Sequence, residues 1–133
     1  MPPDLLTTRP TRRIADLAAA RALFAPIADE AAEVAAFAYL DPQWTLLGLR
    51  HASGSADAVA VPTRLVAGDA LQLDAAMVLM AHNHPSGDAR PSAADRAITR
   101  RLARALDALD IRLFDHLVLA GGVITSFRAL GLL

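Results

Sequence analysis

One short stretch constrains the fold of this chain more than any other, and it begins with an apolar run at residues 75–80. We predict a buried strand here, because the run is short, apolar and followed by turn residues. The chain continues as His82-Asn83-His84. Side chains alternate along a strand, so both histidines should leave it on the same face. Pro85 then ends the strand and begins a turn.

The residues after this turn predict a helix. Pro91-Ser92 opens the helix, and Asp95 lies on its first turn. A strand, a loop and a helix can therefore bring the side chains of His82, His84 and Asp95 together. Two imidazoles and one carboxylate, with a fourth position left for water, are typical of a catalytic rather than a structural zinc site.

Each of these residues also has a simpler interpretation. Ser92-x-x-Asp95 fits a helix cap, in which the hydroxyl accepts a first-turn amide and the acid favours the positive helix end. Two histidines at a strand end can be ordinary hydrogen-bonding residues. Their combination in one short window favours the metal site over separate, unrelated roles.

The whole pattern resembles the JAB/MPN (JAMM) metallopeptidase motif, in the form found in RadC-like proteins. In this chain the matching residues are His82, His84, Pro85, Ser86, Gly87, Pro91, Ser92 and Asp95, with Phe114, Asp115, His116 and Ser126 further on. The resemblance covers about residues 33–132. It implies one zinc ion per chain, held by His82, His84 and Asp95, with Ser92 close to the reacting carbonyl.

A zinc hydrolase also needs a base, because the metal activates water and polarises a carbonyl but does not move protons. Glu30 and Glu33 compete for this role. The family pattern places its glutamate eight residues before a Leu-Asp end, so the resemblance implies Glu33, which precedes Leu40-Asp41 at that spacing. It also implies that Ser92 donates a hydrogen bond to the oxyanion. Glu33 could otherwise be a solvated residue at the start of a strand.

Three further polar residues are expected to support this site without holding the metal. His116 should form a hydrogen bond to a ligand or within the core, not ligate directly. Asn83 should point away from the histidine face and brace the loop. Asp88 should form loop hydrogen bonds, since a fourth protein ligand would close the site.

Size and composition limit the remaining possibilities. The chain has 133 residues, of which 54% are hydrophobic, enough for one core. We expect a flexible lead-in at residues 1–10 and a single domain at residues 11–133. The net charge of −1 argues against nucleic acid or an anionic membrane as a partner, and no apolar run is long enough to span a bilayer. The absence of cysteine excludes thiolate ligands and fits a cytoplasmic protein.

Local patterns predict an α/β fold. Helices are expected at residues 12–25, 63–73 and 92–107, the first of them ended or bent by Pro26. Strands are expected at residues 33–41, 44–49, 58–61, 77–82, 111–120 and 123–127, the last two joined by a Gly121-Gly122 turn. Together they predict a mixed, mostly antiparallel sheet flanked by helices. The resemblance implies the same three-layer JAB/MPN form.

The resemblance implies a zinc-dependent metallopeptidase that cuts an amide or isopeptide bond. Relatives of this family remove ubiquitin or ubiquitin-like proteins from lysines, and bacterial members occur in similar pathways. The expected partner is therefore a protein substrate, such as a ubiquitin-like protein with an extended, small-residue C-terminal tail.

Two alternatives stay open. The chain could be a RadC-type accessory protein in DNA repair, although the segment at residues 12–25 is too short for a helix-hairpin-helix module. The arginines at positions 96, 100 and 104 are expected to form a solvated helix face, because acids interrupt them and no aromatics are interleaved. The chain could also be a non-catalytic JAB scaffold, although such proteins usually lose the metal ligands that are present here.

Overall fold

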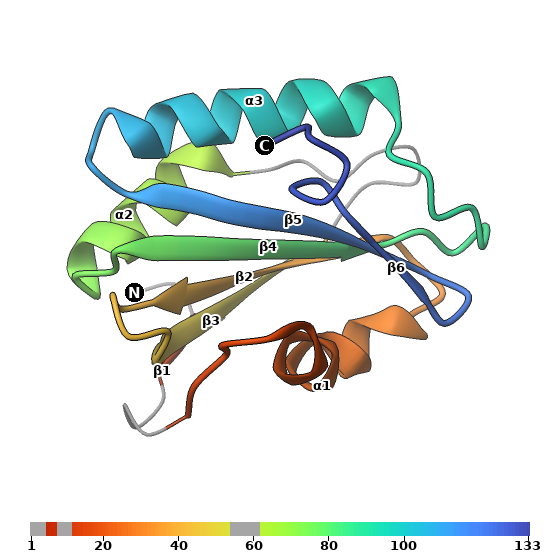
Figure 1. Cartoon of the computed structure of the whole chain (residues 1–133), viewed down its shortest axis with the longest axis horizontal. Helices are drawn as coiled ribbons and strands as arrows, with labels where there is room; N and C mark the ends of the chain where they lie inside the picture. The colour runs from red at the N-terminus through yellow and green to blue at the C-terminus, as the bar shows by residue number, and fades with distance from the viewer. Residues whose placement is uncertain (1–4, 8–11, 54–61) are drawn as a thin grey trace.

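The computed structural model describes residues 5–7, 12–53 and 62–133, which form one sheet with helices on both faces (Figure 1). In chain order the elements are β1 (Leu5–Thr7), α1 (Leu17–Ala28), β2 (Val34–Leu40), β3 (Leu46–Ser53), α2 (Thr63–Gln72), β4 (Met77–Asn83), α3 (Ala93–Asp107), β5 (Arg112–Ala120) and β6 (Val123–Ser126). The strand order is β1-β3-β2-β4-β5-β6, and each neighbouring pair is antiparallel except β4 and β5, which are parallel. The predicted α/β fold with a mixed, mostly antiparallel sheet is confirmed.

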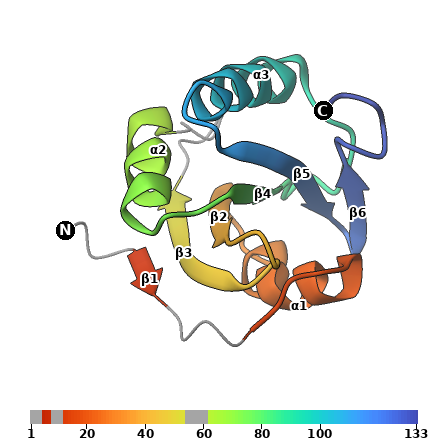
Figure 2. The same ribbon diagram turned by 60° about the vertical axis from the view of Figure 1, so that its left-hand side comes forward.

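The helices divide between the two faces of the sheet (Figure 2). α1 covers one face, and α2 and α3 cover the other. Because successive strand residues point to opposite faces, the fully buried β4 supplies both cores: Leu79 packs on the α1 side and Met80 on the α3 side. Within the described ranges, no helix has the length and apolar character needed to cross a membrane.

The connection from β4 through α3 to β5 determines where polar side chains can gather. Since β4 and β5 are parallel, their carboxyl ends lie at the same end of the sheet, beside the loop into α3 and the turn before β6 (Figure 1). The His84 amide donates to the Leu119 carbonyl at 2.9 Å, which ties this loop to β5. The turn uses Gly121 and Gly122 at positive φ, as their sequence predicts.

The first helix differs from its predicted range of residues 12–25. It begins only after Asp16, whose side chain caps it, so Ile14 is buried ahead of the helix. It also continues through Pro26 and ends at residue 28, which corrects the predicted end. Pro26 leaves the Ala22 carbonyl without its helical partner, but both residues are exposed, so water can satisfy that carbonyl.

The structure also differs from the sequence prediction at two strands. Residues 5–7 form the edge strand β1, with Leu5 opposite Arg50, where we expected only a flexible lead-in. A three-residue strand carries too little alternation to be predicted, and its partner lies far along the chain. β3 begins at Leu46 rather than at residue 44, because Trp44 lies in a turn with a φ of 67°. The strand predicted at residues 58–61 lies outside the described residues.

A buried ion pair joins α2 to the sheet. Arg50 is 1% exposed, and its Nε and one Nη donate to the Asp69 carboxylate at 2.7 and 2.6 Å. The Tyr39 hydroxyl donates to the same carboxylate at 2.7 Å. Burial, reinforced by Asp69, raises the pKa of Tyr39 far above its usual value, so this hydroxyl stays protonated. The cluster therefore depends on a single carboxylate.

Candidate metal centre

Two imidazoles meet where β4 ends. The Nε2 atoms of His82 and His84 are 2.8 Å apart, with ring centroids separated by 4.6 Å. His82 is buried at 2% exposure, and His84 is partly exposed. Strand alternation places both rings on the face covered by α3, which is the convergence that the sequence pattern predicts.

The first turn of α3 adds a carboxylate to this pair. Asp95 Oδ2 lies 3.2 Å from His84 Nε2, and Asp95 Oδ1 lies 3.4 Å from His82 Nε2. Asp95 also completes a capping box: its carboxylate accepts from the Ser92 amide at 2.8 Å, and the Ser92 hydroxyl accepts from the Asp95 amide at 3.0 Å. The helix-cap interpretation is therefore confirmed, and the same carboxylate also faces the imidazoles.

The surroundings of Asp95 favour its charged form. Burial raises its pKa, but the contacts with His82 and the hydrogen bonds from Ser92 outweigh burial, so the pKa lies well below its usual range. The helix N-terminus favours a negative charge as well. Asp95 is thus an anion at neutral pH.

A chain of hydrogen bonds determines which nitrogen of His82 carries a proton. The Thr99 hydroxyl donates its single proton to the Asp95 backbone carbonyl at 2.7 Å, so it accepts from His116 Nδ1 at 2.6 Å. His116 Nε2 then has a lone pair and accepts from His82 Nδ1 at 2.6 Å. His82 Nε2 is left with a lone pair that points toward His84 and Asp95.

His116 is suited to this relay because it remains neutral. Burial, together with the nearby His82, lowers the pKa of His116 to about 3. Its ring is 1% exposed and stacks on Phe127, with centroids 4.4 Å apart. We expected a hydrogen-bonding rather than a ligating role for His116, and the structure places its Nε2 2.6 Å from His82 Nδ1.

Sequence reasoning missed Thr99, which completes the relay. A usable signal was present: Thr99 is a polar residue on the inward-facing stripe of α3, one turn after Asp95 and three residues before Leu102. A buried hydroxyl at such a position needs a partner. Pairing it with the one buried histidine of the neighbouring strand would have predicted the contact.

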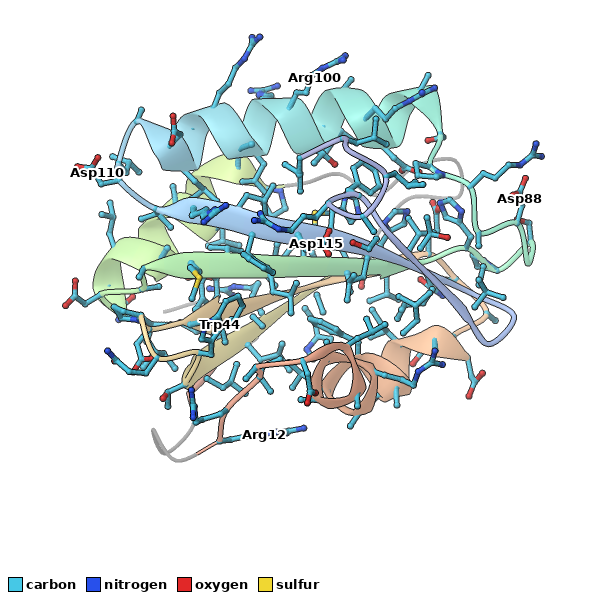
Figure 3. All side chains as sticks on the ribbon, viewed as in Figure 1. Arg12, Trp44, Asp88, Arg100, Asp110 and Asp115 are labelled. Atoms are coloured by element: carbon cyan, nitrogen blue, oxygen red, sulfur yellow. The ribbon has the colours of Figure 1, made fainter. Side chains whose placement is uncertain are left out.

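The second imidazole is oriented by the loop. His84 Nδ1 donates to the Asp88 backbone carbonyl at 2.7 Å, which leaves a lone pair on His84 Nε2. The Asp88 side chain is used differently: Arg90 binds it through Nε at 3.0 Å and one Nη at 2.8 Å, and these hydrogen bonds lower its pKa to about 2. Asp88 lies at the outer bend of the loop (Figure 3), where it braces the loop as expected.

The resulting donor set fits a small divalent cation. Two imidazole lone pairs and one carboxylate point at each other at 2.8, 3.2 and 3.4 Å, and a positive charge among them would remove their mutual repulsion. Tetrahedral zinc with ligands at about 2.0–2.1 Å separates neighbouring ligand atoms by roughly 3.3 Å. The residues present can therefore hold zinc with little rearrangement.

A second carboxylate, from Glu33, lies beside the imidazole pair. Glu33 directly precedes β2, and its Oε1 is 3.8 Å from His84 Nε2. Glu33, His82 and His84 could also form a ligand group, since each offers an atom within 4.8 Å of the others. Asp95 lies closer to the nitrogens, however: it is within 3.4 Å of both, whereas Glu33 is 3.8 Å from His84 Nε2. The competing Glu30 is exposed, and its backbone carbonyl rather than its carboxylate contacts the site strand, through Asn83.

We expect protein purified without chelators to carry about one zinc per chain, and His84→Ala to lose most of it, because two ligands hold the ion far less tightly than three. Elemental analysis of both proteins measures this. His51→Ala is the matched control, since His51 pairs with Ala36 in the sheet and faces the α1 side, away from the site. Equal zinc in the wild type and in His84→Ala would end the assignment.

Comparisons with known proteins agree with the motif. A family model described as RadC-like JAB domain matches residues 14–132. The chain is 48% identical over 101 residues to a UPF0758 protein of Marinomonas sp. (strain MWYL1), covering 75% of this chain and 45% of that protein. It is 43% identical over 112 residues to a UPF0758 protein of Pseudoalteromonas atlantica, covering 84% and 50%. It is 51% identical over 81 residues to the UPF0758 protein YfjY of Escherichia coli K12, covering 61% and 51%.

This chain thus spans about half the length of these relatives. The family match nevertheless runs from Ile14, before the first helix, to Leu132, beyond the last strand. It includes both histidines, Asp95 and Glu33. The chain belongs to the family of RadC-like JAB domains.

Proposed function

We propose that this chain is a zinc-dependent metallopeptidase that hydrolyses an amide or isopeptide bond. One observation carries the proposal: the lone pairs of His82 and His84 converge with the Asp95 carboxylate, and a second carboxylate, Glu33, lies 3.8 Å from His84 Nε2. Three ligands make an open metal site, and a further acid at this distance is what a hydrolase requires.

The protein side chains divide the chemistry between them. Zinc held by His82, His84 and Asp95 would lower the pKa of a bound water toward neutrality and polarise the scissile carbonyl. Glu33 accepts the proton of the attacking water and delivers it to the leaving nitrogen. Its side chain is 20% exposed, so substrate and water can reach it.

Ser92 stabilises the negative charge that develops on the carbonyl oxygen. Its Oγ accepts from the Asp95 amide, and among the described residues this hydroxyl donates to no acceptor. Capping uses the oxygen of this hydroxyl and oxyanion stabilisation uses its hydrogen. Ser92 can therefore fill both roles at once.

Replacement of Ser92 by alanine should lower the rate by about 10²-fold with zinc still bound, the loss expected for one oxyanion donor. Kinetics and zinc content of the same preparation measure this. Ser92→Thr keeps both the hydroxyl and the cap, so it should retain most of the activity. Wild-type turnover by Ser92→Ala would exclude the oxyanion role.

We infer that the substrate is a protein with an extended, small-residue C-terminal tail, as in ubiquitin-like proteins. Two features support this choice. β6 is an edge strand that starts at the same end of the sheet as the site, and an extended tail can add to such an edge by main-chain hydrogen bonds. The loop between β4 and α3 carries Pro85 and Pro91, which limit how far it can move aside for bulky residues.

Fusions of ubiquitin-like proteins to a small reporter at the C-terminal tail test the proposal. We expect cleavage directly after the tail, located by mass spectrometry, and its loss on addition of a chelator. Intact fusions throughout, combined with chelator-insensitive DNA binding at physiological salt, would favour the accessory role in DNA repair over the peptidase.

A further inference from the structure

Asn83 lies between the two imidazoles in the sequence but faces the other way. Strand alternation turns its side chain to the α1 side of the sheet, where it is 0% exposed. A fully buried amide needs hydrogen-bond partners for its carbonyl and for both of its N–H groups. The partners that it finds all belong to one short segment of chain.

That segment surrounds Glu33. Asn83 Oδ1 accepts from the Val34 amide at 2.7 Å, and Asn83 Nδ2 donates to the carbonyls of Glu30 and Ala32, each at 3.0 Å. These partners determine the orientation of the amide, because the opposite orientation would set its oxygen against two carbonyl oxygens. Both donors and the acceptor are thus used on backbone groups on either side of Glu33.

Backbone pairing with β4 does not reach this segment, although the β2–β3 ladder extends one pair further, to Val34 and Ser53. Residues 29–33 lie between α1 and β2, and residues 29–32 are exposed. The β2–β4 ladder ends at the pair Ala35–His82, so the next pair along, Val34 with Asn83, has no backbone pairing. Hydrogen bonds of the Asn83 side chain replace backbone pairing at that point, and they connect β4 to the chain as far back as Glu30.

We propose that Asn83 is a positioning residue that holds the backbone around Glu33 so that its carboxylate stays beside the two imidazoles. The inference rests on the proposed function, in which Glu33 is the base. Three consecutive residues of β4 and its end then have complementary roles: His82 and His84 hold the metal on one face, and Asn83 places the base from the other. Because one strand carries two metal ligands and also anchors the base, the distance between the metal and the base stays constant.

The first test measures backbone exchange in metal-free protein and needs no substrate. In Asn83→Ala we expect the Val34 amide to exchange with deuterium at least about 10-fold faster than in the wild type, because its acceptor is lost. Leu79→Ala is the matched control: Leu79 is buried on the same strand and the same face, but it pairs with Ala38, four residues along β2 from Val34. Unchanged Val34 exchange in Asn83→Ala, or equal acceleration in Leu79→Ala, overturns the proposal.

The second test separates positioning from general stability. Asn83→Ala should keep its zinc, and its KM for the fusion substrate should be unchanged. Its kcat should fall by about 10–100-fold, as expected when a supporting hydrogen bond is removed. In a Glu33→Gln background the same substitution should have no further effect, because the two residues act as one unit. Asn83→Ser, whose hydroxyl is too short to reach all three partners, replaces Asn83→Ala if the latter does not fold.

The two tests distinguish the failure of this inference from the failure of the proposed function. If the kcat losses of Asn83→Ala and Glu33→Gln add in the double variant, the positioning role of Asn83 is overturned, while the peptidase function stands. Full activity of Glu33→Gln overturns the base role of Glu33. Faster exchange of the Val34 amide in Asn83→Ala would still show that Asn83 stabilises the backbone of this segment.

Discussion

Glu33→Gln is expected to keep its zinc and its fold and to lose hydrolysis by about 10²–10⁴-fold, the usual contribution of a general base. Glutamine has nearly the same shape, but its amide cannot accept the proton of the attacking water. The side chain is 20% exposed and its Oε1 lies 3.8 Å from His84 Nε2, so the exchange should disturb little else. Turnover of the cleaved fusion and elemental analysis of the same preparation provide the measurement.

Two control variants make this prediction specific. Glu30→Gln should behave as the wild type, because Glu30 contacts the site only through its backbone carbonyl. Asp95→Asn should lose zinc, because Asp95 lies at 3.2 and 3.4 Å from the Nε2 atoms of the two imidazoles. If Glu33→Gln loses zinc while Asp95→Asn keeps it, then the two carboxylates have the opposite roles, and Glu33 joins the histidines as the third ligand.

The parts of the site that sequence could predict are those built from neighbouring residues. The positions of His82 and His84 follow from strand alternation, and Asp95 follows from the start of a helix a few residues later. Both rules act over a few residues, so tertiary packing had little opportunity to override them. The same holds for the Gly121-Gly122 turn and for the range of α2.

The parts that sequence could not predict are contacts between distant segments. Asn83 was expected to brace its own loop, but it holds a segment that precedes it by about fifty residues. Asp69 lies on a helix whose apolar pattern gives no reason for a buried acid, until Arg50 is placed opposite it. The arginine face of α3 remains exposed, and Arg100 projects away from the sheet (Figure 3). A single sequence shows that a residue is polar, but its partner is known only when the sheet order is known.

Asp69→Leu should be among the most destabilising single changes in this chain. It leaves the Arg50 guanidinium buried at 1% exposure without its counter-ion, and Tyr39 without an acceptor. Breaking a buried ion pair in this way costs about 3–5 kcal/mol, a large part of the roughly 5–15 kcal/mol that stabilises a typical domain. Leucine branches at the same carbon as aspartate and is larger, so no cavity contributes to the loss. Urea denaturation followed by circular dichroism measures the free energy of unfolding.

Two further variants show whether the unpaired charge is the cause. Tyr39→Phe removes one hydrogen bond and leaves the ion pair intact, so it should cost only about 1 kcal/mol. Arg50→Met combined with Asp69→Leu removes both charges, and it should be more stable than Asp69→Leu alone, because no buried charge is left unpaired. One Nη of Arg50 already has no hydrogen-bond partner in the described part of the chain, which favours the apolar replacement further. If the double variant is no more stable than Asp69→Leu, the loss comes from packing between α2 and the sheet and not from the charge.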